Sequence, residues 1–124
     1  MLSSLTFLHT LGARALLTFA VVLGLWATYA YFRNQRLSGG FRSSYLIMAA
    51  LTAVQGLLGV GALIAGGSAR EGILHMVYGV FAVLFLPGAY LYSRGGNDDR
   101  RETLVLAGAC WIVSIAYLRG MFTG

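Results

Sequence analysis

The chain has 124 residues, of which 58% are apolar and 10% are charged, with a formal net charge of +5 and a mean hydropathy of +0.75. Soluble domains carry about 25% charged residues, so this composition excludes an ordinary soluble domain and indicates an integral membrane protein. The length allows one domain, and we expect residues 1–124 to form a single transmembrane domain.

Four long apolar runs predict four membrane-spanning helices. In chain order they cover residues 7–32, 45–66, 73–93 and 103–122. Each reaches the roughly 20 residues that a helix needs to cross about 30 Å of hydrocarbon. No run alternates with a period of two, which argues against a barrel. Because the connectors are short, the predicted fold is all-α: an antiparallel, up-down four-helix bundle in the membrane.

The first run begins without the features of a cleaved signal peptide, since residues 1–4 carry no basic side chain and the apolar run continues far beyond a signal-peptide core. Two ionisable residues lie in this run, His9 near its start and Arg14 deeper. Ionisable side chains inside a membrane are costly, so each is a candidate functional residue. The alternatives are that His9 lies at the wet interface and that Arg14 makes an interhelical hydrogen bond.

The second run is rich in small residues, among them Gly56, Gly59, Gly61 and Gly66. Small residues let helix backbones approach each other closely in lipid. The same residues would also make room beside a planar cofactor. Gln55 is one of the few polar side chains near the predicted midplane.

The third and fourth runs each add one ionisable residue. His75 lies at the start of the third run, and Pro87 predicts a kink toward its other end. Arg119 lies near the end of the fourth run, where it could alternatively extend to water. Cys110 is the chain's single cysteine, which excludes an intrachain disulfide, and we expect it to be a small core residue.

Arginine placement predicts the orientation of the bundle. Six of the nine arginines lie at the connectors 33–44 and 94–102: Arg33, Arg36, Arg42, Arg94, Arg100 and Arg101. By the positive-inside rule these connectors face the cytoplasm, and both termini face outward. We therefore expect a multi-pass protein of a prokaryotic cytoplasmic (inner) membrane, in contact with the lipid bilayer. Acidic neighbours and the lack of a binding fold argue against nucleic acid as a partner.

This topology places both histidines of the chain, His9 and His75, on the same outer side. Two imidazoles can ligate a metal or a heme, and paired imidazole ligation of heme b suits electron transfer. Arg14, Arg70 or Arg119 could pair with heme propionates. The predicted cofactor-binding residues are therefore His9, His75, Arg14, Arg119 and Gln55, with the two histidines as metal ligands.

Residue counts predict that the two histidines lie at different depths. His9 precedes Arg33 by 24 residues, whereas His75 precedes Arg94 by 19. At about 1.5 Å per residue the difference is roughly 7 Å. Helix tilt recovers only part of that, and a kink at Pro87 could cover the rest.

The segment 53–61, Ala-Val-Gln-Gly-Leu-Leu-Gly-Val-Gly, resembles the Gln-x-x-Leu-Gly-Gly segment of heme A synthase membrane helices. The segment 73–76, Ile-Leu-His-Met, looks like that family's following heme-ligand helix, and 8–11, Leu-His-Thr-Leu, is similar to its preceding one. The resemblance spans about residues 6–90. It implies a four-helix bundle with two heme-ligating histidines at the outer ends of helices.

The chain also departs from that family. Heme A synthases have two such halves, and this chain is one. They usually carry His-Arg where this chain has His9 and Thr10, and a catalytic Glu where it has Thr6. The resemblance therefore implies heme b binding by His9 and His75, without the oxygenating chemistry.

The sequence predicts a small cytochrome b-like membrane subunit that binds one heme between the first and third helices near the outer face, for electron transfer. The alternative is a cofactor-free accessory subunit of a larger respiratory or photosynthetic membrane complex, and either would have subunits of such a complex as partners. A transporter or channel is disfavoured, because the midplane offers few polar groups beyond Thr18, Thr52, Gln55 and Ser114. Independent enzymatic activity is least favoured, since no nucleophile–base pair or phosphate loop is present.

Overall fold

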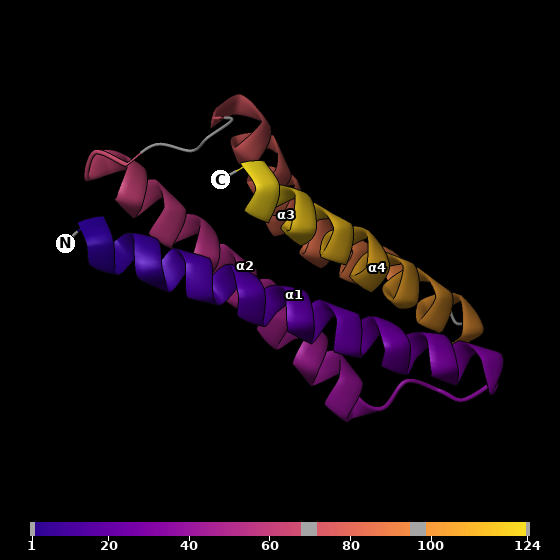
Figure 1. The fold of residues 1–124 in the computed structure, drawn as a ribbon. Helices are drawn as coiled ribbons and strands as arrows, with labels where there is room; N and C mark the ends of the chain where they lie inside the picture. The colour runs from indigo at the N-terminus through magenta and orange to yellow at the C-terminus, as the bar shows by residue number, and fades with distance from the viewer. Residues whose placement is uncertain (1, 68–71, 95–98, 124) are drawn as a thin grey trace.

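The structure, a computed structural model, describes residues 2–67, 72–94 and 99–123. Within these ranges it is all-helical and contains four helices: α1 (Leu2–Phe32), α2 (Gly39–Ile64), α3 (Gly72–Ser93) and α4 (Asp99–Thr123) (Figure 1). Each helix is long and apolar enough to cross a membrane. The predicted all-α, four-helix fold is confirmed.

Three helices begin four or more residues before the apolar runs that predicted them. Helix α1 begins at Leu2, α2 at Gly39 and α4 at Asp99. The start of α2 is set by Ser38, whose hydroxyl accepts a hydrogen bond from the backbone N–H of Phe41 at 3.1 Å. Such a cap satisfies one of the free N–H groups of a helix end. Hydropathy marks only the apolar part of a helix, whereas capping allows the helix to continue through polar residues.

The helices form a ring in which α1 packs on α2 and α4, and α3 packs on α4 and less extensively on α2. Helices α1 and α3 therefore lie diagonally across the bundle. Figure 1 shows α1 and α4 close together where α1 ends and α4 begins, and separating toward the end that holds both termini. We call the end with both termini the histidine end, because His9 and His75 lie there, and the opposite end the arginine end.

The hydrophobic core lies away from the histidine end. The buried residues of α1 begin only at Leu16 and then recur every three or four residues: Leu16, Ala20, Leu23, Ala27 and Ala30. Such spacing puts one stripe of a helix against its neighbours. The largest fully buried side chains are Tyr45, Phe41 and Met48 of α2 and Leu86 and Leu106 of α3 and α4. The first four turns of α1 therefore leave the histidine end more open than the rest of the bundle.

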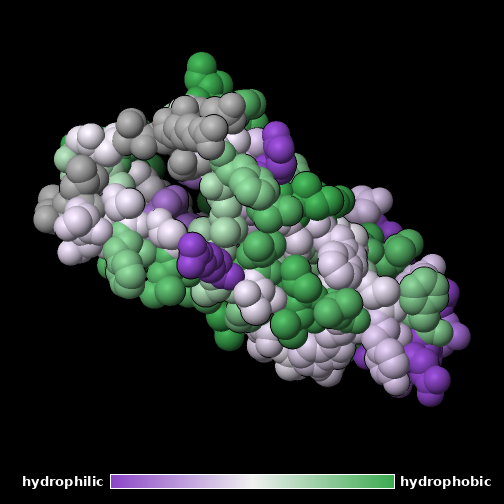
Figure 2. Space-filling model, in the orientation of Figure 1, coloured by the Kyte–Doolittle hydropathy of each residue, from purple (hydrophilic) through white to green (hydrophobic). Residues whose placement is uncertain are grey.

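Polar contacts tie the helices together at the arginine end. Glu102 of α4 accepts hydrogen bonds from the Nε and Nη2 of Arg42 of α2, at 3.2 and 2.7 Å. Arg36 pairs with Asp99 at 2.8 Å in a more exposed position. Figure 2 shows strongly hydrophilic residues gathered at this end, and fewer of them along the rest of the face in view, where apolar and intermediate residues predominate. Exposed apolar surface on this scale is suited to lipid rather than water.

Two further residues from the sequence analysis can be placed. Helix α3 continues through Pro87, and the phenol of Tyr45 donates a 2.7 Å hydrogen bond to the carbonyl oxygen of the preceding Leu86.

Cys110 is buried with a free thiol. The buried position of Cys110 agrees with the expected small core residue.

Candidate functional site

A cavity of about 240 Å³ opens among all four helices at the histidine end. Its walls include small residues from every helix: Ala13, Gly56, Gly79, Ala82, Ala116 and Gly120. Its inner lining includes the buried residues Leu16, Thr52 and Tyr117. Thr52 and Tyr117 are joined by a hydrogen bond between their hydroxyl groups. Small side chains on every helix keep the centre of this end of the bundle unfilled.

His9 and His75 meet in this cavity. Their ring centroids are 5.8 Å apart and their ring planes are inclined by 70°. The depth difference predicted from residue counts does not keep the rings apart. That count assumed that both helices run equally steeply, but α1 leans away from α4 toward the histidine end, so part of its extra length runs sideways (Figure 1).

Each imidazole is anchored through its Nδ1 to the backbone of a neighbouring helix. His9 Nδ1 lies 3.2 Å from the carbonyl oxygen of Gln55 on α2, and His75 Nδ1 lies 3.0 Å from that of Gly120 on α4. The Thr123 hydroxyl is a second neighbour of His75 Nδ1, at 3.3 Å. Because a carbonyl oxygen only accepts, Nδ1 is the donor in each of these bonds, and Nε2 is the ring nitrogen left to act as a ligand. This arrangement is typical of metal-ligating histidines.

Gln55 and two glycines shape the surroundings of His9. The side-chain amide of Gln55 donates a 2.5 Å hydrogen bond to the backbone oxygen of His9. A methyl group at Gly59 would lie 3.0 Å from His9 Cε1, and one at Gly12 would collide with the Gln55 side chain. The sequence assigned Gly59 to packing or to room for a cofactor, whereas the structure shows that it makes room for the imidazole itself.

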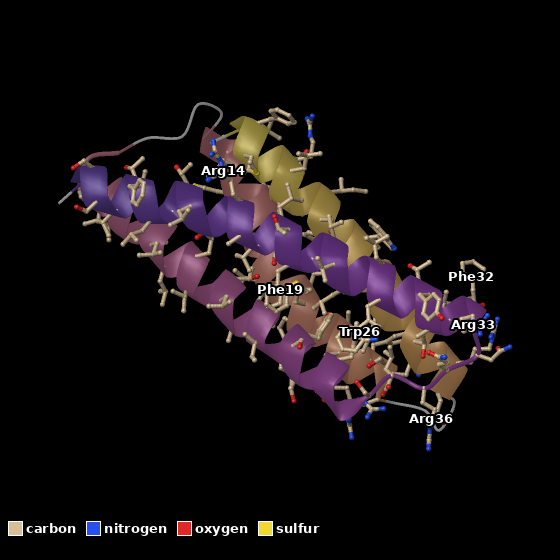
Figure 3. All side chains as sticks on the ribbon, turned by 60° about the horizontal axis from the view of Figure 1, so that its bottom comes forward. Arg14, Phe19, Trp26, Phe32, Arg33 and Arg36 are labelled. Atoms are coloured by element: carbon tan, nitrogen blue, oxygen red, sulfur yellow. The ribbon has the colours of Figure 1, made fainter. Side chains whose placement is uncertain are left out.

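The predicted cationic residues have different positions. Arg14 lines the cavity, and Figure 3 shows its side chain extending from α1 toward the ends of α3 and α4. Arg119 is not among the cavity-lining residues. Its guanidinium carbon lies 5.9 Å from the ring centroid of Tyr78, which does line the cavity. Arg70 lies outside the described residues. Four of the five predicted site residues thus line one cavity.

The sequence analysis did not assign Tyr78 or Tyr117 to the site. Both line the cavity. Tyr78 follows His75 by one helical turn, and Tyr117 precedes Gly120 by the same interval, so each shares a helix face with a residue of the site. That spacing could have identified Tyr78 once His75 was singled out, whereas Tyr117 is spaced from Gly120, which the sequence analysis did not assign to the site.

The number of imidazoles at this site bears on which kinds of metal centre it could hold. Among the described residues no group of three or more His, Cys, Asp or Glu side chains could hold a metal. Two imidazoles fill only half of a tetrahedral zinc site, whereas heme iron needs only axial protein ligands.

No family model, no curated protein and no solved structure matches the chain. The class that the fold defines is therefore a four-helix bundle whose helices can each cross a membrane. The relation to heme A synthases stays a prediction.

Proposed function

We propose that this protein is a small cytochrome b-like membrane subunit, which binds one heme b between α1 and α3 and takes part in electron transfer. One observation carries the proposal: two imidazoles from diagonal helices meet with their ring centroids 5.8 Å apart, each with its Nδ1 bonded to a carbonyl oxygen. The chain contains no other histidine. A heme held there would supply a one-electron iron couple.

The surrounding residues support the same proposal. His9 and His75 would hold the heme iron through Nε2, and their Nδ1 bonds would fix ring orientation and raise ligand basicity. Arg14 at the cavity would balance propionate charge. By the arginine distribution, the heme would lie near the outer face of a prokaryotic inner membrane. The protein would then exchange electrons with other subunits or carriers at that face.

Heme reconstitution tests the proposal. The full chain is expressed with added heme, purified in mild detergent, and analysed by reduced-minus-oxidised absorption and by electron paramagnetic resonance. We expect about one heme per chain with a low-spin signature of two imidazole ligands. His75→Ala should remove that signature, and added imidazole should restore it. The rescue separates loss of a ligand from loss of the fold.

Two results would overturn the proposal. The first is a well-folded wild-type chain that takes up no heme under saturating conditions. If that chain also co-purifies with a stoichiometric membrane partner, it supports the cofactor-free accessory subunit instead. The second is an unchanged heme signature and stoichiometry in both His9→Ala and His75→Ala.

A further inference from the structure

A second cavity, of about 390 Å³, lies between α3 and α4, the helices that run side by side in Figure 1, in the half nearer the arginine end. It is a groove, lined by Phe85, Gly88, Ala89, Tyr92, Leu104, Val105, Gly108, Ala109 and Ile112. We call it the α3–α4 groove. A methyl group at either Gly88 or Gly108 would meet no atom within 4 Å. The glycines therefore leave space in the groove that no described side chain fills.

Arg101 lies at the end of this groove. The guanidinium carbon of Arg101 lies 4.4 Å from the ring centroid of Tyr92, which lines the groove. Arg101 precedes Leu104 and Val105 by one helical turn, so it lies on the α4 face that forms the groove. A groove that is apolar along its length therefore has a positive charge at the depth of the membrane–water interface.

This arginine lacks a carboxylate partner among the described residues. Both described carboxylates are paired with other arginines, Asp99 with Arg36 and Glu102 with Arg42. Arg101 Nη1 is buried and has no hydrogen-bond acceptor within the described part of the chain. A buried donor without an acceptor costs about 1–3 kcal/mol. An anionic acceptor from outside the chain would remove this cost once the guanidinium turns outward to meet it.

We propose that the α3–α4 groove binds one anionic glycerophospholipid. Its phosphate accepts hydrogen bonds from Arg101, and an acyl chain lies along the groove over Gly88 and Gly108. Both chemical halves of a phospholipid are matched: the guanidinium forks onto phosphate oxygens, and the apolar walls cover the hydrocarbon. Basic sites between membrane helices on the cytoplasmic side bind lipid headgroups in this way. The proposal does not depend on heme binding at the other end of the bundle.

Native mass spectrometry of the detergent-solubilised chain tests the proposal. Phosphatidylglycerol is added in parallel with phosphatidylcholine of identical acyl chains. We expect one retained phosphatidylglycerol per chain and weaker retention of phosphatidylcholine. Arg101→Gln should weaken phosphatidylglycerol binding about fivefold. Arg33→Gln is the matched control, because Arg33 lies over Tyr29 at the end of α1, outside the groove, and it should change binding less than twofold.

A groove-filling variant tests the acyl-chain half. Gly108→Leu adds a side chain where the structure leaves space, and it should reduce phosphatidylglycerol retention without lowering the helix content measured by circular dichroism. Inorganic phosphate at the same concentration should not compete. The proposal is overturned by equal retention of the two lipids, by equal effects of Arg101→Gln and Arg33→Gln, by competition from inorganic phosphate, or by unchanged binding in Gly108→Leu.

Discussion

Gln55 and His9 hold each other through two hydrogen bonds that run in opposite directions between α1 and α2. The imidazole Nδ1 of His9 donates to the backbone oxygen of Gln55 at 3.2 Å, and the Gln55 amide donates to the backbone oxygen of His9 at 2.5 Å. The pair fixes both the rotation of α1 against α2 and the direction in which the His9 ring points. One candidate ligand is thus positioned before any cofactor binds.

Removing one of these two bonds should weaken heme binding without abolishing it. Gln55→Leu deletes the amide donor but keeps the backbone acceptor for His9. The lost bond is worth about 1 kcal/mol, so heme affinity should fall about fivefold, as measured by competition with apomyoglobin. Thr18→Val, which removes an exposed hydroxyl bonded to the Arg14 carbonyl, is the control and should leave affinity unchanged. Equal affinities for Gln55→Leu and wild type would show that the amide does not position His9.

The contact between Gly59 and His9 should make this glycine sensitive to a single methyl group. In Gly59→Ala the new methyl lies 3.0 Å from His9 Cε1 and must displace the ring. Overpacking of this kind costs about 1–3 kcal/mol, and we expect a loss of heme affinity of about tenfold with an altered low-spin resonance. Gly61→Ala, whose methyl would lie an ordinary 3.8 Å from Leu5, is the control on the same helix. Matching spectra for the two variants would contradict the geometry.

Arg14 should influence the potential of a bound heme more than Arg119 does. Arg14 lines the cavity, whereas Arg119 lies over Tyr78 and is not a lining residue. Loss of a nearby positive charge disfavours the reduced, more negative heme, so Arg14→Gln should lower the midpoint potential by about 40 mV, equivalent to about 1 kcal/mol for one electron. Arg119→Gln should shift it by less than half as much in the same redox titration. A larger shift in Arg119→Gln would make Arg119 the residue that balances the propionates.

The two ion pairs at the arginine end should differ in their contribution to stability. The side chains of Arg42 and Glu102 are 30% and 12% exposed, whereas those of Arg36 and Asp99 are 79% and 48% exposed. Exposed pairs contribute about 0–1 kcal/mol, and a less exposed, doubly bonded pair contributes more. Glu102→Gln should therefore lower Tm in detergent by about 3–5 °C, and Asp99→Asn by about 1 °C or less. Equal shifts in a thermal scan would show that burial does not distinguish the pairs.

The fold could be predicted from the sequence because hydropathy alone separates the four helices. Short connectors then force neighbouring helices to be antiparallel. The helix starts at Leu2, Gly39 and Asp99 could not be read from hydropathy, since backbone hydrogen bonds continue a helix through polar residues, with a serine cap at the start of α2. In α1 the buried core residues start only at Leu16. This starting point depends on how the four helices incline to one another, and hydropathy does not report those inclinations.

The candidate site could be predicted in part. The two histidines could be assigned to one end because an up-down topology places the starts of the first and third helices together. The partners of their Nδ1 atoms could not be predicted, since the oxygens of Gln55 and Gly120 belong to the backbone and every residue has one. Which backbone oxygens the imidazoles contact depends on how each helix is rotated about its axis. The predicted difference in depth between His9 and His75 assumed that their helices are equally inclined. Helix α1 leans away from α4, so this assumption does not hold (Figure 1).

The diagonal placement of α1 and α3 has a consequence for assembly. His9 is oriented by a carbonyl of α2, and His75 by a carbonyl and a hydroxyl of α4. Neither α1 with α2 nor α3 with α4 therefore carries both oriented imidazoles. The pair of oriented imidazoles exists only when the fourth helix has packed against the others. A ligand that needs both rings would bind the finished bundle and not its two- or three-helix precursors. Binding of this ligand would then show that all four helices had inserted and packed together.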